Sequence, residues 1–135
     1  MDECVFCSEA VRKQGTIYED DMCFVILDKY PISEGHMLVI PRKHYKDMIS
    51  APEDTVCHIF KIAKQMGERV IKRLDASGVN VTTNIGTAAG QLIMHFHVHV
   101  VPRYKDRKSP DDGFVFNHNV PLADSLRGKL INVLK

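Results

Sequence analysis

The sequence lacks a strong excess of charge of either sign. Its 135 residues include 18 lysines and arginines and 17 aspartates and glutamates, which gives a formal net charge of +1. A protein that binds nucleic acid through its phosphates needs a concentrated excess of positive charge. The balance therefore gives no indication of a nucleic-acid-binding surface.

Long apolar runs, repeats and linkers are lacking as well. No stretch approaches the roughly 20 apolar residues of a transmembrane helix. The start, Met1-Asp2-Glu3-Cys4, is acidic and has neither the basic residues nor the apolar run of a signal peptide. With 44% hydrophobic and 26% charged residues, the composition is that of an ordinary globular protein. We therefore expect a single domain covering residues 1–135, soluble, cytoplasmic and without a membrane partner.

Hydrophobic periodicity and turn residues predict an α+β fold. Between about Pro52 and Leu74, apolar residues recur at helical spacing and form one stripe, which must cover a sheet. The remaining apolar segments alternate or are bounded by Gly and Pro, as strands are. We expect a five-stranded, mainly antiparallel sheet covered by this long helix. The expected strands are residues 16–19, 23–27, 36–40, 80–85 and 94–101; short helices are expected at 8–13 and 122–134, and a loop at 103–112.

Three histidines alternate with apolar residues in His95-Phe96-His97-Val98-His99-Val100-Val101. On a strand this alternation places the histidines on one face and the apolar residues on the other. Successive side chains of one face start about 7 Å apart, so one histidine can reach a reacting atom while its neighbours contact the same ligand. The pattern indicates an active site. Two alternatives are polar residues merely tolerated on a solvated face, and three imidazoles holding a catalytic zinc.

The segment Cys4-Val5-Phe6-Cys7 has the spacing at which two thiolates bind one tetrahedral metal ion. By itself it supplies half of such a site. A redox function is the alternative, but the βαβ pattern typical of thioredoxin-like motifs does not surround this pair.

With its neighbouring segments, the histidine motif resembles that of the histidine-triad family of nucleotide hydrolases and transferases. Ala89-Gly90-Gln91, Val101-Pro102-Arg103 and the segment from Gly35 to Pro41 also resemble family segments, in the family's order. The resemblance is nearly continuous over a core from about residue 4 to 104, whereas the tail from 105 to 135 is less informative. It implies a HIT-like fold and a homodimer formed through the long helix and the edge of the sheet.

The resemblance also implies a role for each residue of the site. His97 would attack the phosphorus bound to a nucleoside and form a covalent nucleotidyl-histidine, in agreement with the nucleophilicity of a neutral imidazole near pH 7. Other residues would contact the nucleotide: His99 and His36 flanking the phosphate, Asn84 and Gln91 as neutral donors, Gly90 for close backbone approach, Asp28 at the ribose hydroxyls, and Phe6 and Ile26 around the base.

Zinc-containing microbial members of the family imply a metal set of Cys4, Cys7, His44 and His95. Four protein ligands leave no position for a catalytic water, so the zinc would be structural. The substrate would be a purine nucleoside phosphoramidate, a dinucleoside polyphosphate or a similar adenylylated compound, cleaved at a phosphorus–nitrogen or phosphoanhydride bond. Leu92 stands where the family commonly has a serine or threonine near the leaving group, which leaves a non-catalytic nucleotide-binding module as the alternative.

Overall fold

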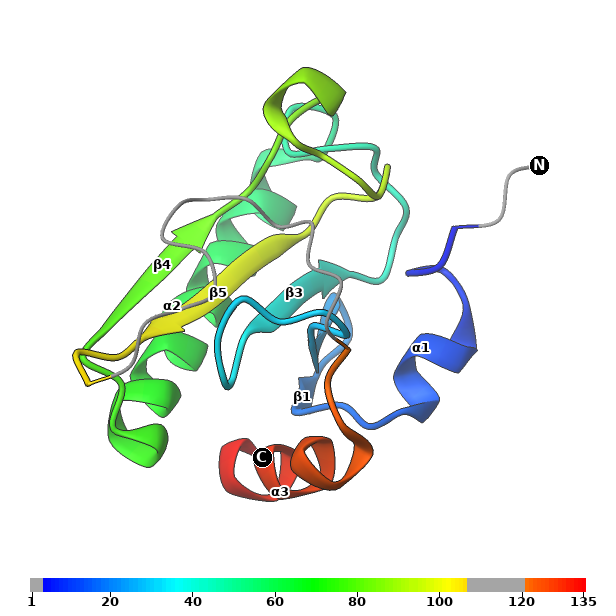
Figure 1. Cartoon of the computed structure of the whole chain (residues 1–135). Helices are drawn as coiled ribbons and strands as arrows, with labels where there is room; N and C mark the ends of the chain where they lie inside the picture. Colours follow the sequence, from blue (N-terminus) through cyan, green and yellow to red (C-terminus); the bar gives the residue numbers. More distant parts are fainter. Residues whose placement is uncertain (1–3, 107–120) are drawn as a thin grey trace.

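The computed structural model describes residues 4–106 and 121–135. A five-stranded sheet with the order β1-β2-β3-β5-β4 forms its centre, and every neighbouring pair of strands is antiparallel (Figure 1). The strands are β1 (Tyr18–Glu19), β2 (Cys23–Leu27), β3 (Met37–Pro41), β4 (Gly78–Thr82) and β5 (Val98–Arg103). The predicted fold class is confirmed.

One long helix, α2 (Glu53–Leu74), packs against one face of this sheet. Its buried stripe follows the predicted helical spacing and includes Ile59, Ile62, Ala63, Met66 and Val70. The other helices are short: α1 (Glu9–Lys13), the 3-10 turn η1 (Thr87–Ala89) and α3 (Asp124–Leu134). Within the two described stretches, no helix is long and apolar enough to cross a membrane.

Strand β2 is buried on both faces, so its alternation separates two cores. Cys23, Val25 and Leu27 join the main core under α2. Phe24 and Ile26 point to the opposite face and form a smaller cluster, whose other buried members are Phe6, Leu38 and Ile40. The N-terminal segment therefore covers the face of the sheet that α2 leaves open.

The strand that carries the histidines begins later than the sequence pattern predicts. β5 starts at Val98, so His95 and His97 precede the strand and only His99 lies within it. The reason is that the N–H of Phe96 donates to the carbonyl of Tyr45, 2.6 Å away in the loop after β3, rather than to a neighbouring strand. Alternation nevertheless holds across the junction, because Phe96 is buried in the α2 core as predicted.

Further bounds differ from the expectation, and β1 comprises Tyr18–Glu19 rather than residues 16–19. β4 comprises Gly78–Thr82 rather than residues 80–85, since its register with β5 pairs Gly78 with Arg103 and Thr82 with His99. β3 is displaced by one residue, to Met37–Pro41.

The C-terminal part returns to the sheet beside the loop that follows β2. The N–H of Leu122 donates to the carbonyl of Lys29 at 2.8 Å. The guanidinium groups of Arg69 and Arg73 both donate to the carbonyl of Leu134, at 3.0 Å each, and so fix the end of α3 against α2. The predicted terminal helix corresponds to α3, whereas most of the predicted loop at 103–112 lies outside the described residues.

Candidate active site and metal centre

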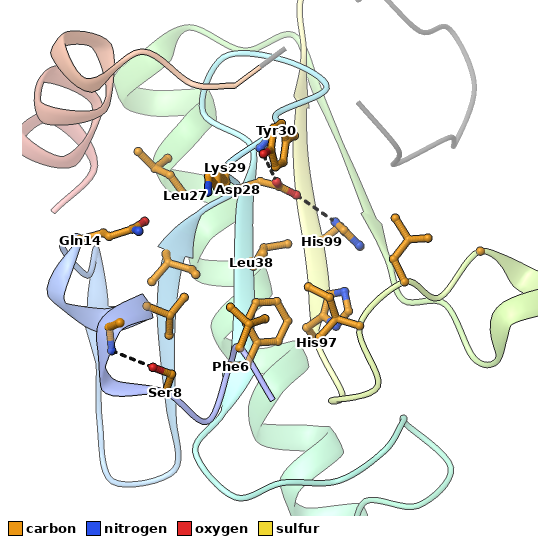
Figure 2. Close-up of a pocket in the computed structure, with 17 residues that line it drawn as sticks. Phe6, Ser8, Gln14, Leu27, Asp28, Lys29, Tyr30, Leu38, His97 and His99 are labelled. Carbon is orange, nitrogen blue, oxygen red and sulfur yellow. Dashed lines mark hydrogen bonds and ion pairs between the residues drawn. The ribbon is translucent and has the colours of Figure 1, made fainter. Parts of the chain in front are cut away.

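A cavity of about 660 Å³ opens on the face of the sheet opposite α2. Figure 2 shows His97 and His99 at one end and Gln14, at the end of α1, at the other. Apolar side chains lie between these ends, among them Phe6 and Leu38. A cavity of this size with an apolar centre and a few polar groups is typical of a small-molecule site.

His97 is held in one tautomer by the main chain. Its Nδ1 lies 2.7 Å from the carbonyl oxygen of His95. A carbonyl oxygen only accepts hydrogen bonds, so we infer that Nδ1 carries the hydrogen and Nε2 keeps its lone pair. The residue is 8% exposed, and burial lowers its pKa. The imidazole is therefore neutral near pH 7, the form in which Nε2 is nucleophilic.

His99 is oriented by a relay of hydrogen bonds that begins at the backbone. The N–H of Ile32 donates to Nδ1 of His36 at 3.0 Å, which leaves the hydrogen of His36 on Nε2. That Nε2 lies 2.9 Å from Nδ1 of His99, so His99 accepts there and carries its own hydrogen on Nε2. Burial, together with the neighbouring His36, lowers the pKa of His99 to about 2. His99 is thus a neutral donor on the cavity wall.

The structure places His36 behind His99 rather than on the cavity wall. It is 1% exposed and does not line the cavity. Its Nε2 bonds His99 and lies 3.4 Å from a carboxylate oxygen of Asp28. In this position His36 orients His99, and the direct phosphate contact implied by resemblance stays a prediction.

Asp28 lines the cavity at the end of β2. One carboxylate oxygen accepts the N–H of Tyr30 at 2.8 Å, as in an Asx turn, and the other lies 4.0 Å from Nδ1 of His99 (Figure 2). Burial raises the pKa of Asp28 to about 6. The turn uses one oxygen, and the second, 3.4 Å from Nε2 of His36, lies at the cavity with further lone-pair capacity for a ligand.

The raised pKa of Asp28 predicts a pH-dependent affinity for nucleosides. If the carboxylate accepts hydrogen bonds from ribose hydroxyls, adenosine should bind progressively more weakly below pH 6, by up to about tenfold per pH unit. Adenosine is the suitable ligand because it has no phosphate that titrates in this range. Calorimetric titration between pH 5 and 8 measures the effect, and in Asp28→Asn the affinity should no longer change with pH over this range. A parent affinity that is constant from pH 5 to 8 would contradict the assignment.

Asn84 and Gln91, the predicted neutral donors, form hydrogen bonds that hold the loop after β4. Gln91 is 2% exposed; its Oε1 accepts the N–H of Gly86 at 2.8 Å, and its Nε2 donates to the carbonyls of Lys46 and Ile93 at 2.7 and 3.0 Å. Asn84 donates to the carbonyl of Gly90 at 3.3 Å. Gly90 lines the cavity, whereas Asn84 and Gln91 do not. The two amides hold the loop in shape, and their contacts with a phosphate stay predictions.

Predicted and unpredicted residues both line the cavity. Phe6 and Ile26, which are expected around a base, lie on its wall. Gln14, Lys29 and Tyr30 line it too but are not predicted, and only the proximity of Lys29 and Tyr30 to Asp28 in the sequence could have indicated them.

Cys4, Cys7, His44 and His95 converge into a second cluster next to the cavity. Nδ1 of His95 lies 3.3 and 3.5 Å from the sulfurs of Cys4 and Cys7 and 3.1 Å from Nδ1 of His44, which in turn lies 3.4 Å from the sulfur of Cys7. Zinc bonds of about 2.1 Å to nitrogen and 2.3 Å to sulfur place tetrahedral ligands about 3.4–3.8 Å apart. These four distances are close to that range, with the two nitrogens slightly nearer, and all four ligand atoms lie within 4.8 Å of one another.

The surroundings of His95 support its suitability as a ligand. Its Nε2 lies 2.8 Å from the carbonyl oxygen of Pro41, so Nε2 carries the hydrogen and the lone pair of Nδ1 faces the two sulfurs. Metal-binding histidines characteristically donate their other N–H in this way. The donor set of two thiols and two imidazoles is one of those that structural zinc sites use.

A further polar cluster ties the β1–β2 turn to α2. One carboxylate oxygen of Asp20 accepts the N–H groups of Met22 and Cys23, at 2.8 Å each. The other lies 2.8 Å from the hydroxyl of Tyr18 and 2.7 Å from Nε2 of His58. Both oxygens of this carboxylate are engaged within the fold, which accounts for the cluster as a structural feature.

Comparison with known proteins identifies the family of this chain. The model of the HIT domain family matches residues 9–106. An uncharacterized HIT-like protein of Saccharolobus solfataricus is 38% identical over 110 residues, covering 80% of this chain and 78% of the relative. The chain therefore belongs to the HIT family, and the resemblance inferred from its motifs is confirmed.

Named relatives and solved structures add detail about other members. The adenylylsulfatase HINT3 of Arabidopsis thaliana is 37% identical over 106 residues, which cover 76% of this chain but 53% of that protein. A hypothetical histidine triad nucleotide-binding protein from Sulfolobus tokodaii superposes with a TM-score of 0.83 at 36% identity, over 97% of this chain and 89% of that one. A zinc-bound histidine triad family protein from Mycobacterium smegmatis superposes with a TM-score of 0.77 at 33% identity, over 98% of this chain and 93% of that one.

Proposed function

We propose that the chain is a nucleotidyl hydrolase or transferase in which His97 is the nucleophile. The observation that carries the proposal is the 2.7 Å hydrogen bond from Nδ1 of His97 to the carbonyl of His95. It keeps the lone pair on Nε2 of a neutral, buried imidazole at the end of a nucleoside-sized cavity. Family membership and the nucleotide-binding name of the Sulfolobus tokodaii neighbour support the choice of ligand.

The reaction has two displacements at one phosphorus. For a phosphoramidate, Nε2 of His97 attacks phosphorus and the bond to the leaving nitrogen breaks, while that nitrogen takes up a proton from water. A second water then attacks phosphorus, the bond to Nε2 breaks, and this water releases a proton. The products are the nucleoside monophosphate and the amine, and an acceptor other than water makes the protein a transferase.

The same cavity would bind the rest of the nucleotide. The Nε2–H of His99 would donate to a phosphate oxygen, where negative charge develops during attack. Gly90, with φ of 92°, lets the loop backbone approach the phosphate without a Cβ in the way. Asp28 would accept from the ribose hydroxyls, and Phe6 and Ile26 would pack on a purine base.

Zinc is the proposed occupant of the cluster of Cys4, Cys7, His44 and His95. When bound, it would tie the N-terminal segment to the segment that precedes β5, a structural role consistent with four protein ligands. The zinc-bound Mycobacterium smegmatis neighbour supports this metal. A catalytic zinc on the triad itself is disfavoured, because His95 would be a ligand of the structural ion and Nδ1 of His99 accepts a hydrogen bond from His36.

A homodimer is proposed through α2 and the edge of the sheet. β4 is an edge strand of the described sheet, and Val81 on β4 and Ile71 on α2 are exposed apolar side chains. Pairing of the β4 edges of two copies, with their α2 helices alongside, would cover the side chains of Val81 and Ile71. Analytical ultracentrifugation of the full chain at micromolar concentration tests it. A cytoplasmic location stays a prediction.

The function is tested with a panel of adenylylated substrates that differ in the leaving group. It includes an adenosine phosphoramidate, a diadenosine polyphosphate and adenylyl sulfate, the last because HINT3 is named an adenylylsulfatase. Acid-free trapping followed by intact-mass measurement should detect one adenylyl group on the parent during turnover and none on His97→Ala. Because the exposed Leu92 offers no hydrogen-bond donor at the cavity, leaving-group preference has to be measured. Adenosine monophosphate binding without turnover of any substrate would favour the non-catalytic alternative.

A further inference from the structure

Phe6 lies between the two thiols in the sequence and between the two sites in space. Its ring packs edge-on against His95, with 5.8 Å between ring centroids, and against His97, with 5.1 Å. It is 3% exposed and lines the cavity next to His97 (Figure 2). One aromatic ring thus touches a proposed metal ligand, the proposed nucleophile and the space for the nucleotide.

The turn formed by Cys4 to Ser8 is one wall of the cavity. Its N–H groups bond backward, from Cys7 to the carbonyl of Cys4 at 3.0 Å and from Ser8 to that of Val5 at 3.3 Å. Val5, Phe6 and Ser8 line the cavity, while the sulfurs of Cys4 and Cys7 face His95 and His44. The turn that presents the thiols to a metal is therefore the turn that presents the wall to a nucleotide.

These contacts make both ligands depend on one conformation. A metal can bridge the thiols and imidazoles only while the turn lies against His95. A nucleotide can pack on Phe6 only while the turn is in the same place. When the free chain also populates conformations in which the turn lies elsewhere, two ligands that select this one each raise the affinity of the other, by the same factor.

We propose that Phe6 is a positioning residue that couples metal occupancy to nucleotide binding in this chain. The proposal rests on the function proposed for the cavity. Metal binding docks Phe6 beside His97, which completes the wall against which the nucleotide packs. Nucleotide binding in turn holds the thiols in place for the metal. We expect a coupling factor of about 10, within the range usual for coupled sites.

The test measures zinc affinity by competition with a chromophoric chelator, with and without saturating adenosine monophosphate. Calorimetry then gives the affinity of adenosine monophosphate for the metal-loaded and the metal-free chain. In the parent we expect the same factor of about 10 in both directions. In Phe6→Ala the factor should fall to about 1. If alanine prevents folding, Phe6→Leu takes its place and should show a factor between about 1 and that of the parent.

Ile26→Ala is the matched control. Ile26 lines the same cavity from β2 and has no place in the turn that carries the thiols. Its replacement should weaken nucleotide binding while the coupling factor remains about 10. A purely structural loss of stability would reduce the factor equally in Phe6→Ala and Ile26→Ala, and that result would overturn the proposal.

The remaining outcomes separate this inference from the proposed function. If the metal-loaded parent does not bind adenosine monophosphate, the function proposed for the cavity is wrong. If the parent binds it with a coupling factor of 1, the function stands and the coupling is wrong. If the factor is the same in Phe6→Ala as in the parent, the coupling does not run through Phe6.

Discussion

Replacing His97 by alanine is expected to lower kcat for an adenosine phosphoramidate by about 10⁴-fold or more. In the proposed mechanism the imidazole forms the covalent intermediate, and removal of a nucleophile leaves only the contribution of binding and electrostatic stabilisation. The other histidine of the cavity wall, His99, cannot replace it in its present tautomer, because its Nδ1 accepts a hydrogen bond from His36 and its Nε2 carries hydrogen. Single-turnover kinetics measures the chemical step directly.

The loss should be specific to the chemical step. His97→Ala should still bind adenosine monophosphate and retain its metal, because the atom that bonds Nδ1 of His97 belongs to the backbone of His95. His58→Ala is the control, since His58 contacts Asp20 outside the cavity. It should keep kcat within about a factor of two, as expected for a change remote from the chemistry. An unchanged kcat in His97→Ala would rule out the mechanism.

Disruption of the metal cluster is expected to lower the melting temperature by about 10–20 °C. A ligand at about 1,000 times its Kd stabilises a fold by about 4 kcal/mol, and each kcal/mol shifts the melting temperature of a domain of this size by roughly 3–5 °C. Cys4→Ser or Cys7→Ser should produce this shift, and so should chelation of the parent. Differential scanning calorimetry, with metal content measured on the same samples, provides the test.

Cys57→Ser gives the matched control, because Cys57 is an exposed cysteine on α2 that lies outside the cluster. It should leave both the melting temperature and the metal content unchanged. Chelated protein that remains folded should retain kcat, with a higher KM that follows from the weaker wall at Phe6. Complete loss of kcat from folded, metal-free protein would instead support a catalytic metal on the triad.

The long helix and the strand alternation could be predicted from the sequence, because both depend on local periodicity. The apolar stripe of α2 and the burial of Phe96, Val98 and Val100 follow directly from spacing. The start of β5 could not be predicted in the same way. It depends on the bond from Phe96 to Tyr45, a partner 51 residues away, which no local pattern contains.

For the site too, the sequence indicates which residues take part, whereas their hydrogen-bond partners come from the tertiary structure. The sequence identified the histidines and the cysteines, but the hydrogen-bond partner of each ring nitrogen comes from the tertiary structure. That partner decides which nitrogen of His97 carries the hydrogen, and it places His36 behind His99. Gln91 has the chemistry of a phosphate donor, yet its distant contact with Lys46 engages its amide in the loop.

The carbonyl of His95 has an evolutionary consequence. A main-chain oxygen is present whatever residue occupies position 95, so the hydrogen bond to His97 does not depend on the identity of that side chain. Mutation can therefore remove the proposed metal ligand at position 95 while His97, the proposed nucleophile, keeps its tautomer, provided that the backbone stays in place. The orientation of His99, in contrast, depends on the identity of another side chain, because the group that orients it is the imidazole of His36. The metal cluster and the histidine relay can thus change independently of each other.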